Sequence, residues 1–542
     1  MKIFFLSFII LNCFAVYNSF SQNLISKENL IEHTFTLGSD EFEGRGTGER
    51  GGEKAAQYLA NEFQKLNLEP LGDNNTYFQN IRMHGAKPLT TSELVLHKDG
   101  EEIKFNLWDD YLLYSSGEQT FIPAPLELIF AGYGIVAPEY DYNDYQSINV
   151  EGKIVVFLEG EPISEDRSFF DAERPTIHSY PDVKQRVALS RGARGSILIP
   201  YYPDEDFPGW EKLKNGFSFE DVTLAYSVTN SLALLFKPEA ARILFSNSGY
   251  TLDDIYNFHS KGYMISFEMN CGISFRGEFK ERDFIASNII GMVEGKDSEL
   301  KDSYMIVSAH YDHLGIGVPV KGDSIYNGVF DNAIGVSAVL ELARIFSEKA
   351  ESKRSIIFIL LTGEEKGLLG SKYYTDNPVV PLYKTVADIN IDGVALFDNF
   401  KSVIGIGAEY STLTDFLNNV AADDKVKVTH IPSEFRNADA FSRSDQVSFA
   451  NAGIPSILVM EAPDYVSMSK AEGLKKFIKY SEDIYHSPFD DLSQYMNFDA
   501  AVQHIDIIYD LCKMLVNSEE VPVWENDAPY INARLRSIAE KK

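Results

Sequence analysis

Residues 356 to 365 read Ile356-Ile357-Phe358-Ile359-Leu360-Leu361-Thr362-Gly363-Glu364-Glu365. The apolar part is short, continuous and rich in branched residues, which predicts a buried strand. This strand ends at Gly363, and a helix is expected over 366–375. Two adjacent carboxylates at a strand end are costly unless a cation compensates them. A metal ion would take one carboxylate as a ligand and leave the other free for proton transfer, whereas the alternative is a solvated turn.

The chain from Ile285 onward alternates predicted strands with predicted helices. Strands are expected at 304–309, 355–361, 386–391, 402–406 and 456–460, and helices at 333–347, 366–375, 410–421 and 500–516. Such alternation is typical of an α/β fold with a mixed, mainly parallel sheet sandwiched by helices.

The first half of the chain has a different pattern. Residues 23–82 contain Glu43-Gly44-Arg45-Gly46 and then a predicted helix with one apolar face: Ala55, Leu59, Phe63 and Leu66. Residues 83–282 contain short strand-like runs between turn residues, so we interpret them as an inserted, β-rich region. Its expected strands are 94–96, 126–130, 154–158 and 196–199, with a helix at 183–189. Residues 521–542 are expected to form a polar tail, and residues 283–520 to complete the domain begun by 23–82.

Length and composition limit the kinds of protein this chain can be. A chain of 542 residues is too long for a single core and indicates two or three domains. The net charge of -31 argues against nucleic acid and anionic membranes as partners, because little here would neutralise phosphates.

The N-terminus has the pattern of a cleaved secretory signal over residues 1–22. Lys2 supplies the positive charge and residues 3–17 the apolar segment, which is short for a membrane span. We therefore expect a secreted or periplasmic protein, and we do not expect Cys13 to carry a lipid, because the apolar run continues past it. Only Cys271 and Cys512 would remain, which is neither a disulfide framework nor a thiolate metal site; whether they pair stays open.

Polar residues follow each predicted strand of the second half, at the sheet edge where ligands bind in parallel sheets. His310 follows the strand at 304–309, Glu364 and Glu365 follow 355–361, and Asp392 follows 386–391. Asp331 precedes the helix at 333–347, and His486 lies in a loop before the last helix. Imidazole and carboxylate groups without thiolates suit a catalytic zinc site, although Mn²⁺ or Co²⁺ would fit the same groups.

The order and spacing of these motifs resemble the M28 family of metallopeptidases over roughly residues 35 to 80 and 283 to 515. The motifs are Ala309-His310-Tyr311-Asp312-His313, Phe330-Asp331-Asn332, Thr362-Gly363-Glu364-Glu365, Asn390-Ile391-Asp392 and Tyr485-His486-Ser487-Pro488. Arg443-Ser444-Asp445 is also similar to the family. Residues 120–275 resemble a protease-associated (PA) domain. This resemblance rests on Gly132-Tyr133-Gly134, Gly152-Lys153-Ile154-Val155 and Arg194-Gly195.

The resemblance implies a zinc-exopeptidase fold and a site for two Zn²⁺ ions. One ion would be held by His310 and Asp392, the other by Glu365 and His486, with Asp331 bridging both. Two such ions would lower the pKa of a water held between them and polarise the scissile carbonyl.

The resemblance also implies roles for three further residues. Glu364 would be the general base, Asp312 would orient the His310 imidazole, and Tyr485 would stabilise the oxyanion. The family pattern further implies a cis peptide bond at Asp331-Asn332.

We therefore expect a secreted dizinc exopeptidase that hydrolyses peptides, most readily an aminopeptidase, because clustered carboxylates suit a substrate's α-ammonium group. A carboxypeptidase of the glutamate carboxypeptidase type is the alternative, with Arg436 or Arg443 holding the C-terminal carboxylate. A glutaminyl cyclase and a receptor-like protein without activity are two further alternatives, disfavoured because all five ligands are present. Residues 120–275 contain no cluster of possible metal ligands and are expected to serve substrate access or recognition.

Overall fold

The computed structural model describes residues 24–541 except 115–120, 165, 167, 171–175, 203–208, 228–230, 247, 433–434 and 436–439. The expected secretory signal at 1–22 lies outside the described residues, as does Arg436. Among the helices that are described, none is both long and apolar enough to cross a membrane.

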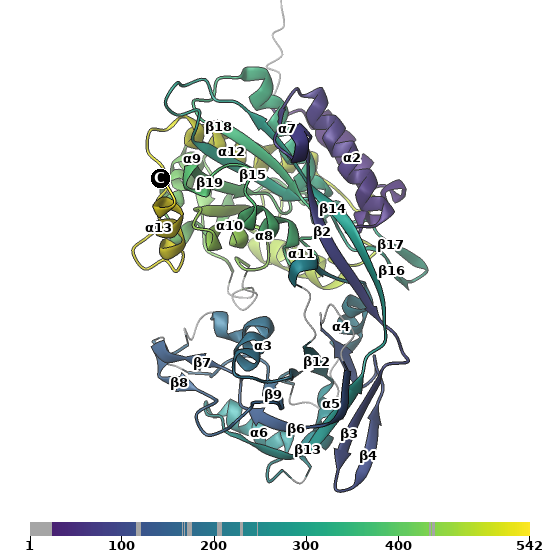
Figure 1. Cartoon of the computed structure of the whole chain (residues 1–542). Helices are drawn as coiled ribbons and strands as arrows, with labels where there is room; N and C mark the ends of the chain where they lie inside the picture. Colours follow the sequence, from purple (N-terminus) through teal and green to yellow (C-terminus); the bar gives the residue numbers. More distant parts are fainter. Residues whose placement is uncertain are drawn as a thin grey trace, which may run out of the picture.

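A sheet of ten strands, counted over the described residues, organises the main lobe of the molecule (Figure 1). Its order is β11 (Asp221–Leu224), β2 (Phe78–Pro88), β14 (Phe279–Val293), β18 (Ser355–Leu361), β15 (Tyr304–His310), β19 (Thr385–Asn390), β22 (Ser456–Glu461), β20 (Ser402–Ile406) and β21 (Lys427–Val428), with β1 (Glu69–Pro70) beside β14. The four central strands, β18, β15, β19 and β22, are parallel to one another, and their neighbours β14 and β20 are antiparallel. The mixed, mainly parallel character predicted from sequence is confirmed.

Helices cover both faces of this sheet because its central strands are apolar on both sides. The β18 side chains Ile356, Phe358 and Leu360 belong to one core, and Ile357 and Ile359 to another. The first core contains residues of α1 (Lys27–Leu37), α2 (Arg50–Lys65), α7 (Ile334–Lys349), α9 (Leu413–Asp423) and α12 (Phe498–Asn517). The opposite face is covered by α8 (Leu369–Asp376), α10 (Gln446–Asn451) and α13 (Ile531–Ala539).

An eight-stranded sheet, counted over the described residues, belongs to a second lobe, drawn below the first in Figure 1. We call it the inserted lobe, because its residues lie in the chain between β2 and β14. Its order is β4 (Glu101–Phe105), β3 (Glu93–Lys98), β13 (Ser266–Arg276), β6 (Phe121–Ala131), β9 (Ile154–Leu158), β10 (Gly195–Ile199), β12 (Leu232–Phe236) and β5 (Tyr111–Leu113). Four helices accompany it: α3 (Pro181–Ser190), α4 (Trp210–Phe217), α5 (Pro238–Phe245) and α6 (Leu252–Ser260).

The two lobes are tied together by long strands and by an exchanged segment. β2 and β14 pair over eleven residues and run from one lobe into the other (Figure 1). The sequence boundaries at 82/83 and 282/283 therefore fall inside these strands. β11 comes from the middle of the insert, yet it pairs with β2 at the edge of the main sheet. Arg282 of β14 fixes this segment by donating hydrogen bonds to Glu220 at 2.8 and 2.9 Å.

The C-terminal segment is more ordered than the polar tail expected from sequence. Trp524 is buried and its indole N–H donates to the Gly453 carbonyl at 3.0 Å. Arg534 of α13 donates to the Thr385 carbonyl at 3.0 Å. Two of the three cysteines lie in the described residues, Cys271 in β13 and Cys512 in α12, and both are buried and form no disulfide.

A buried histidine in α12 gives this fold an acid-sensitive contact. The His504 ring is fully buried, with Nδ1 accepting the Ala395 N–H at 3.0 Å and Nε2 donating to the Val459 carbonyl at 3.1 Å. Both nitrogens are therefore satisfied in the neutral ring. Burial lowers the pKa of His504 to about 4.

We predict that protonation of His504 contributes to acid unfolding. Because its pKa is lower in the folded chain, the unfolded chain binds the proton more tightly. The contribution of this residue to stability is complete above about pH 6.5 and is lost as the pH falls towards 4. Between pH 7 and pH 5 the loss is about 2 kcal/mol. Urea unfolding at these two pH values should show a smaller pH effect in His504→Gln than in the unmodified protein, and equal pH effects would contradict the assignment.

Candidate metal centre

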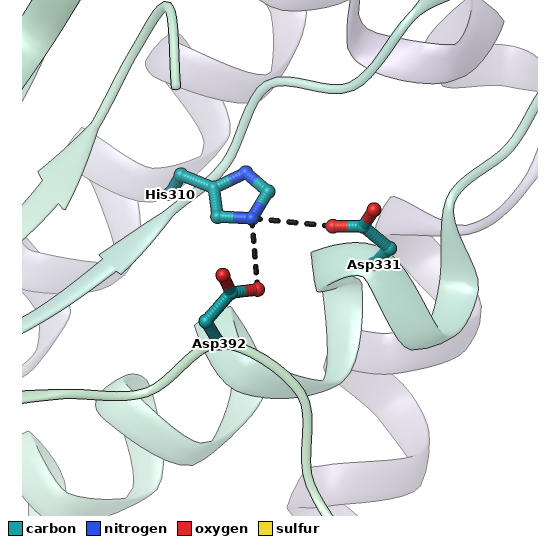
Figure 2. A group of neighbouring side chains, drawn as sticks. All are labelled: His310, Asp331 and Asp392. Atoms are coloured by element: carbon teal, nitrogen blue, oxygen red, sulfur yellow. Dashed lines mark hydrogen bonds and ion pairs between the residues drawn. The ribbon is translucent and has the colours of Figure 1, made fainter. Parts of the chain in front are cut away.

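His310, Asp331 and Asp392 meet at the carboxyl edge of the main sheet, where β15 and β19 end (Figure 2). His310 is the last residue of β15, and its side chain is 1% exposed. Its Nε2 lies 3.2 Å from Asp331 Oδ1 and 3.1 Å from Asp392 Oδ1. Three ligand-type atoms therefore converge in one place, as expected for these three residues.

A second group of ligand-type atoms lies on the other side of Asp331. His486 Nε2 is 3.2 Å from Asp331 Oδ2 and 3.1 Å from Glu365 Oε2. His313 Nδ1 is 2.6 Å from Glu365 Oε1 and 3.8 Å from Asp331 Oδ2. The two oxygens of Asp331 thus face different groups, which is the arrangement of a bridging carboxylate.

The sequence alone assigned no role to His313, although this residue belongs to the same motif as His310. The structure places it with Asp331 and Glu365 in a group that could hold a metal ion. The available signal is its position three residues after His310, just beyond the end of β15, which brings a second imidazole to the same sheet edge.

The backbone around Asp331 is held in place by buried side chains. The Asp490 carboxylate accepts the N–H groups of Phe330 and Asp331 at 2.9 and 3.0 Å. The peptide bond between Asp331 and Asn332 is cis, as the family pattern implies. The Asn332 side chain donates to the Ile391 carbonyl at 2.8 Å and accepts the Gly393 N–H at 2.9 Å, so it connects the Asp331 segment to the segment containing Asp392.

Several nitrogen and oxygen atoms of the second group have no hydrogen-bonding partner in the described part of the chain, which indicates that this group fits a cation. His313 Nδ1, His313 Nε2, His486 Nε2 and Glu365 Oε1 are buried, and none has a hydrogen-bonding partner among the described residues. A buried polar atom without a partner costs roughly 1–3 kcal/mol, so several in one place require an explanation. Imidazole nitrogens and carboxylate oxygens are preferred ligands of Zn²⁺, which would satisfy them together.

The charges of the site shift the pKa values of its members in opposite directions. Burial opposes ionisation of Asp331, but the His310 and His486 imidazoles beside it hold its pKa well below the ordinary value. Burial likewise opposes ionisation of Glu365, but the charges of His486 and His313 lower its pKa to about 2. Both carboxylates therefore remain charged and able to bind a cation.

Glu364 behaves differently from its neighbour. Burial, together with the charges of Glu365, Asp392 and Asp445, raises the pKa of Glu364 well above its ordinary value. A carboxylate with a raised pKa accepts a proton more readily, which is the property that a general base requires.

Asp312 connects the turn that carries Glu364 to the N-terminal segment. Its Oδ1 accepts the Glu364 N–H at 3.1 Å, and its Oδ2 accepts the Thr47 hydroxyl at 2.8 Å. The His310 Nδ1 lies 3.1 Å from the carbonyl oxygen of Asp312 and 3.9 Å from its carboxylate. The backbone of Asp312 is therefore closer to the imidazole than the carboxylate expected to orient it.

Arg45, in the Glu43-Gly44-Arg45-Gly46 motif, holds several main-chain segments together. Its guanidinium is fully buried and donates to four main-chain carbonyls at 2.6–2.8 Å: Tyr311, Leu37, Asn327 and Gly328. Three of these carbonyls, those of Tyr311, Asn327 and Gly328, lie in the segments next to the predicted ligands His310 and Asp331. Arg45 thus supports the site without contacting it, a role that depends on tertiary structure and that the motif alone did not indicate.

The comparisons with known proteins agree with this geometry. Residues 288–512 match the model of peptidase family M28. This part of the chain is therefore similar to peptidase family M28. The matched residues include all five predicted metal ligands and Glu364.

Curated relatives match short parts of the chain. It is 35% identical over 137 residues to a "Probable zinc metalloprotease" of Pyrenophora tritici-repentis, covering 25% of this chain and 30% of the relative. It is 31% identical over 172 residues to "Aminopeptidase YwaD" of Bacillus subtilis, covering 32% of this chain and 34% of the relative. The chain thus spans about a third of the length of these relatives.

Solved structures match over nearly the whole chain. Among them, an aminopeptidase from Aneurinibacillus sp. strain AM-1 aligns with a TM-score of 0.55 and 20% sequence identity. The alignment covers 92% of this chain and 96% of the other. At this identity, the likeness establishes the fold alone.

A cavity of about 290 Å³ opens beside the predicted metal ligands. Asp331, Glu364 and Asp392 lie in its wall together with Tyr485. The rest of the wall is largely apolar and includes Leu396, Phe397, Ile404, Ile406, Leu458 and Phe477. The Tyr485 ring stacks on that of His486, with the ring centres 3.8 Å apart.

The Arg443-Ser444-Asp445 motif lies beside this cavity. The Asn390 side chain, at the end of β19, donates to Ser444 Oγ and to Gln446 Oε1, both at 2.8 Å. Arg443 and Ser444 contribute to the cavity wall, whereas Asp445 is fully buried. The motif thus fixes one side of the cavity relative to the main sheet.

Proposed function

We propose that the chain is a secreted dizinc exopeptidase that removes N-terminal residues from peptides. The observation that supports this most directly is the pair of side-chain groups sharing Asp331, beside a cavity that also contains Glu364. His310 and Asp392 would hold one Zn²⁺, Glu365 and His486 the other, and Asp331 both. Residues 23–82 and 283–520 would form the peptidase domain. Secretion rests on the signal pattern at 1–22.

The catalytic roles follow from the protein groups around the cavity. When bound, two divalent cations would polarise the scissile carbonyl and lower the pKa of the attacking water. Glu364 would take the proton of that water and deliver it to the leaving amine, since its pKa is raised by burial. Asp312 would hold the Glu364 turn, and the Tyr485 hydroxyl would donate to the developing oxyanion.

The charge distribution favours substrates with a free N-terminus. Asp331, Glu364 and Asp392 lie together at one part of the cavity wall and would accept charge-assisted hydrogen bonds from an α-ammonium group. Arg443 is exposed and is the described residue that could hold a C-terminal carboxylate in the alternative carboxypeptidase. The apolar remainder of the cavity would accept a large apolar N-terminal side chain.

The inserted lobe would restrict access to this cavity. Tyr180, at the start of α3, donates its hydroxyl to Ser442 Oγ at 3.2 Å, next to Arg443 in the cavity wall. Figure 1 shows α3 on the side of the inserted lobe that faces the main lobe. A PA domain over about 120–275 would thus limit substrates to short or unstructured chains.

The test compares one apolar peptide, such as Leu-Ala-Phe, in three forms. We expect the free peptide to lose leucine, the N-acetylated peptide to resist cleavage, and the C-terminally amidated peptide to be cleaved at a similar rate. Aminoacyl amides of leucine and phenylalanine should be cleaved faster than those of aspartate. Cleavage of the acetylated peptide from its C-terminus would establish the carboxypeptidase alternative instead.

A further inference from the structure

The second group of ligand-type atoms contains one histidine more than the two-metal scheme above requires. His313 is completely buried, and its Nδ1 faces Glu365 Oε1 at 2.6 Å and Asp331 Oδ2 at 3.8 Å. Its ring and that of His486 lie with their centres 5.6 Å apart at 67°. Two imidazoles therefore lie beside the same two carboxylates, Glu365 and Asp331.

The approach of His313 to Glu365 is too oblique for a hydrogen bond. Neither Nδ1 nor Oε1 has a hydrogen-bonding partner among the described residues, despite their short separation. The pair formed by His178 and Glu139 in the inserted lobe has almost the same separation, 2.7 Å, and it is a hydrogen bond. The two pairs thus differ in geometry, not in distance. In the His313 pair, two ligand-type atoms lie close together without a well-formed hydrogen bond between them.

The chain holds the His313 ring in this orientation from several sides. Its backbone N–H donates to the Arg45 carbonyl at 3.3 Å. The ring packs against Gly328, where an added Cβ would lie 2.5 Å from the ring. Gly328 also has a φ of +59°, so both conformation and space favour glycine at this position. The ring therefore has little freedom to turn towards another partner.

We propose that His313 is a ligand of the second cation, in addition to Glu365, His486 and Asp331. This proposal rests on the dizinc site proposed above and extends it. The first group then offers one imidazole and two carboxylates, and the second offers two of each. Because imidazole suits Zn²⁺ and Co²⁺ better than Mg²⁺ or Mn²⁺, the second group is the one that fills first and retains its ion.

The first test measures cation affinity in the metal-free full-length protein, by Zn²⁺ titration against a competing chelating dye. The unmodified protein should bind two equivalents with a tighter and a weaker step. His313→Gln should weaken the tighter step by at least about tenfold, as should His486→Gln, because each removes a ligand. His178→Gln is the matched control and should leave both steps unchanged.

The second test replaces His313 with a cysteine, whose thiolate gives a spectroscopic signal when it binds a metal ion. A thiolate is a preferred ligand of Zn²⁺ and Co²⁺, so His313→Cys loaded with Co²⁺ should show a sulfur-to-cobalt charge-transfer band in the near ultraviolet. The unmodified protein and His178→Cys should lack this band. Circular dichroism of each metal-free variant identifies any that fails to fold, and the band can be read without any activity.

The outcomes separate this proposal from the proposed function. If the unmodified protein binds two cations and cleaves peptides, yet His313→Gln titrates normally and His313→Cys shows no band, His313 is not a ligand and only the further inference fails. If the unmodified protein binds no cation, the dizinc function fails, and the His313 proposal fails with it.

Discussion

Glu364→Gln is expected to lower kcat by about 10²- to 10⁴-fold while the protein still binds two cations. The amide preserves the size of the side chain but removes its ability to accept a proton. Glu364 donates its backbone N–H to Asp312, and the substitution leaves this hydrogen bond in place. The turn and the neighbouring ligands should therefore keep their positions, and the loss should be in turnover.

Glu365→Gln provides the matched comparison, because it makes the same change one residue later. Glu365 faces His313 and His486, so its amide should weaken cation binding as well as turnover. Metal content after gel filtration and kcat measured with excess Zn²⁺ distinguish the two variants. If Glu364→Gln lost a cation and Glu365→Gln retained both, the roles of the two glutamates would be exchanged.

The main sheet was predictable because each central strand carries its own signal. Residues 355–361 form a continuous apolar run, and the predicted strand coincides with β18. Strands at 304–309, 386–391, 402–406 and 456–460 are confirmed within one residue, and the predicted helices within three residues. Burial on both faces gives such strands an unbroken apolar pattern, which composition alone reveals.

The connection between the lobes was not predictable in the same way. β2 alternates buried and exposed residues, contains Arg82, His84 and Lys87, and changes lobes part-way along its length. β11 is only four residues long and joins a sheet whose other strands lie far away in the chain. Such pairings depend on tertiary contacts, so local pattern placed the domain boundaries inside continuous strands.

The site also contains residues that local sequence pattern predicts and residues whose roles depend on tertiary contacts. His310 and Asp392 lie at or directly after strand ends, so the topology of a parallel sheet brings them together. His313 and Arg45 act through geometry instead: one through the direction of a ring, the other through four main-chain carbonyls. The direction of the His313 ring and the carbonyl contacts of Arg45 cannot be read from the sequence, which shows only the positions of these two residues.

Removal of the cations is expected to abolish peptide hydrolysis and to lower thermal stability. Asp331, Glu364, Glu365 and Asp392 are then left close together without the cations that would compensate their charge. Each cation binds the folded chain, and at a concentration a hundred times its Kd it contributes about 2.7 kcal/mol to stability. Dialysis against a chelator should therefore reduce both activity and melting temperature, and about two equivalents of Zn²⁺ should restore them.

The histidine ligands allow this effect to be assigned to each group of the site. His310→Ala should lose one cation and His486→Ala the other. Each variant should be inactive even with excess Zn²⁺, because one ion alone cannot both polarise the carbonyl and activate the water. His84→Ala is the control, since His84 pairs with Asp283 on β14, outside both ligand groups. Full activity in a metal-free preparation, or unchanged metal content in both ligand variants, would show that these residues do not form a catalytic metal site. A loss of stability without loss of activity would instead make the cations structural, and Glu364 would then need another partner to activate water.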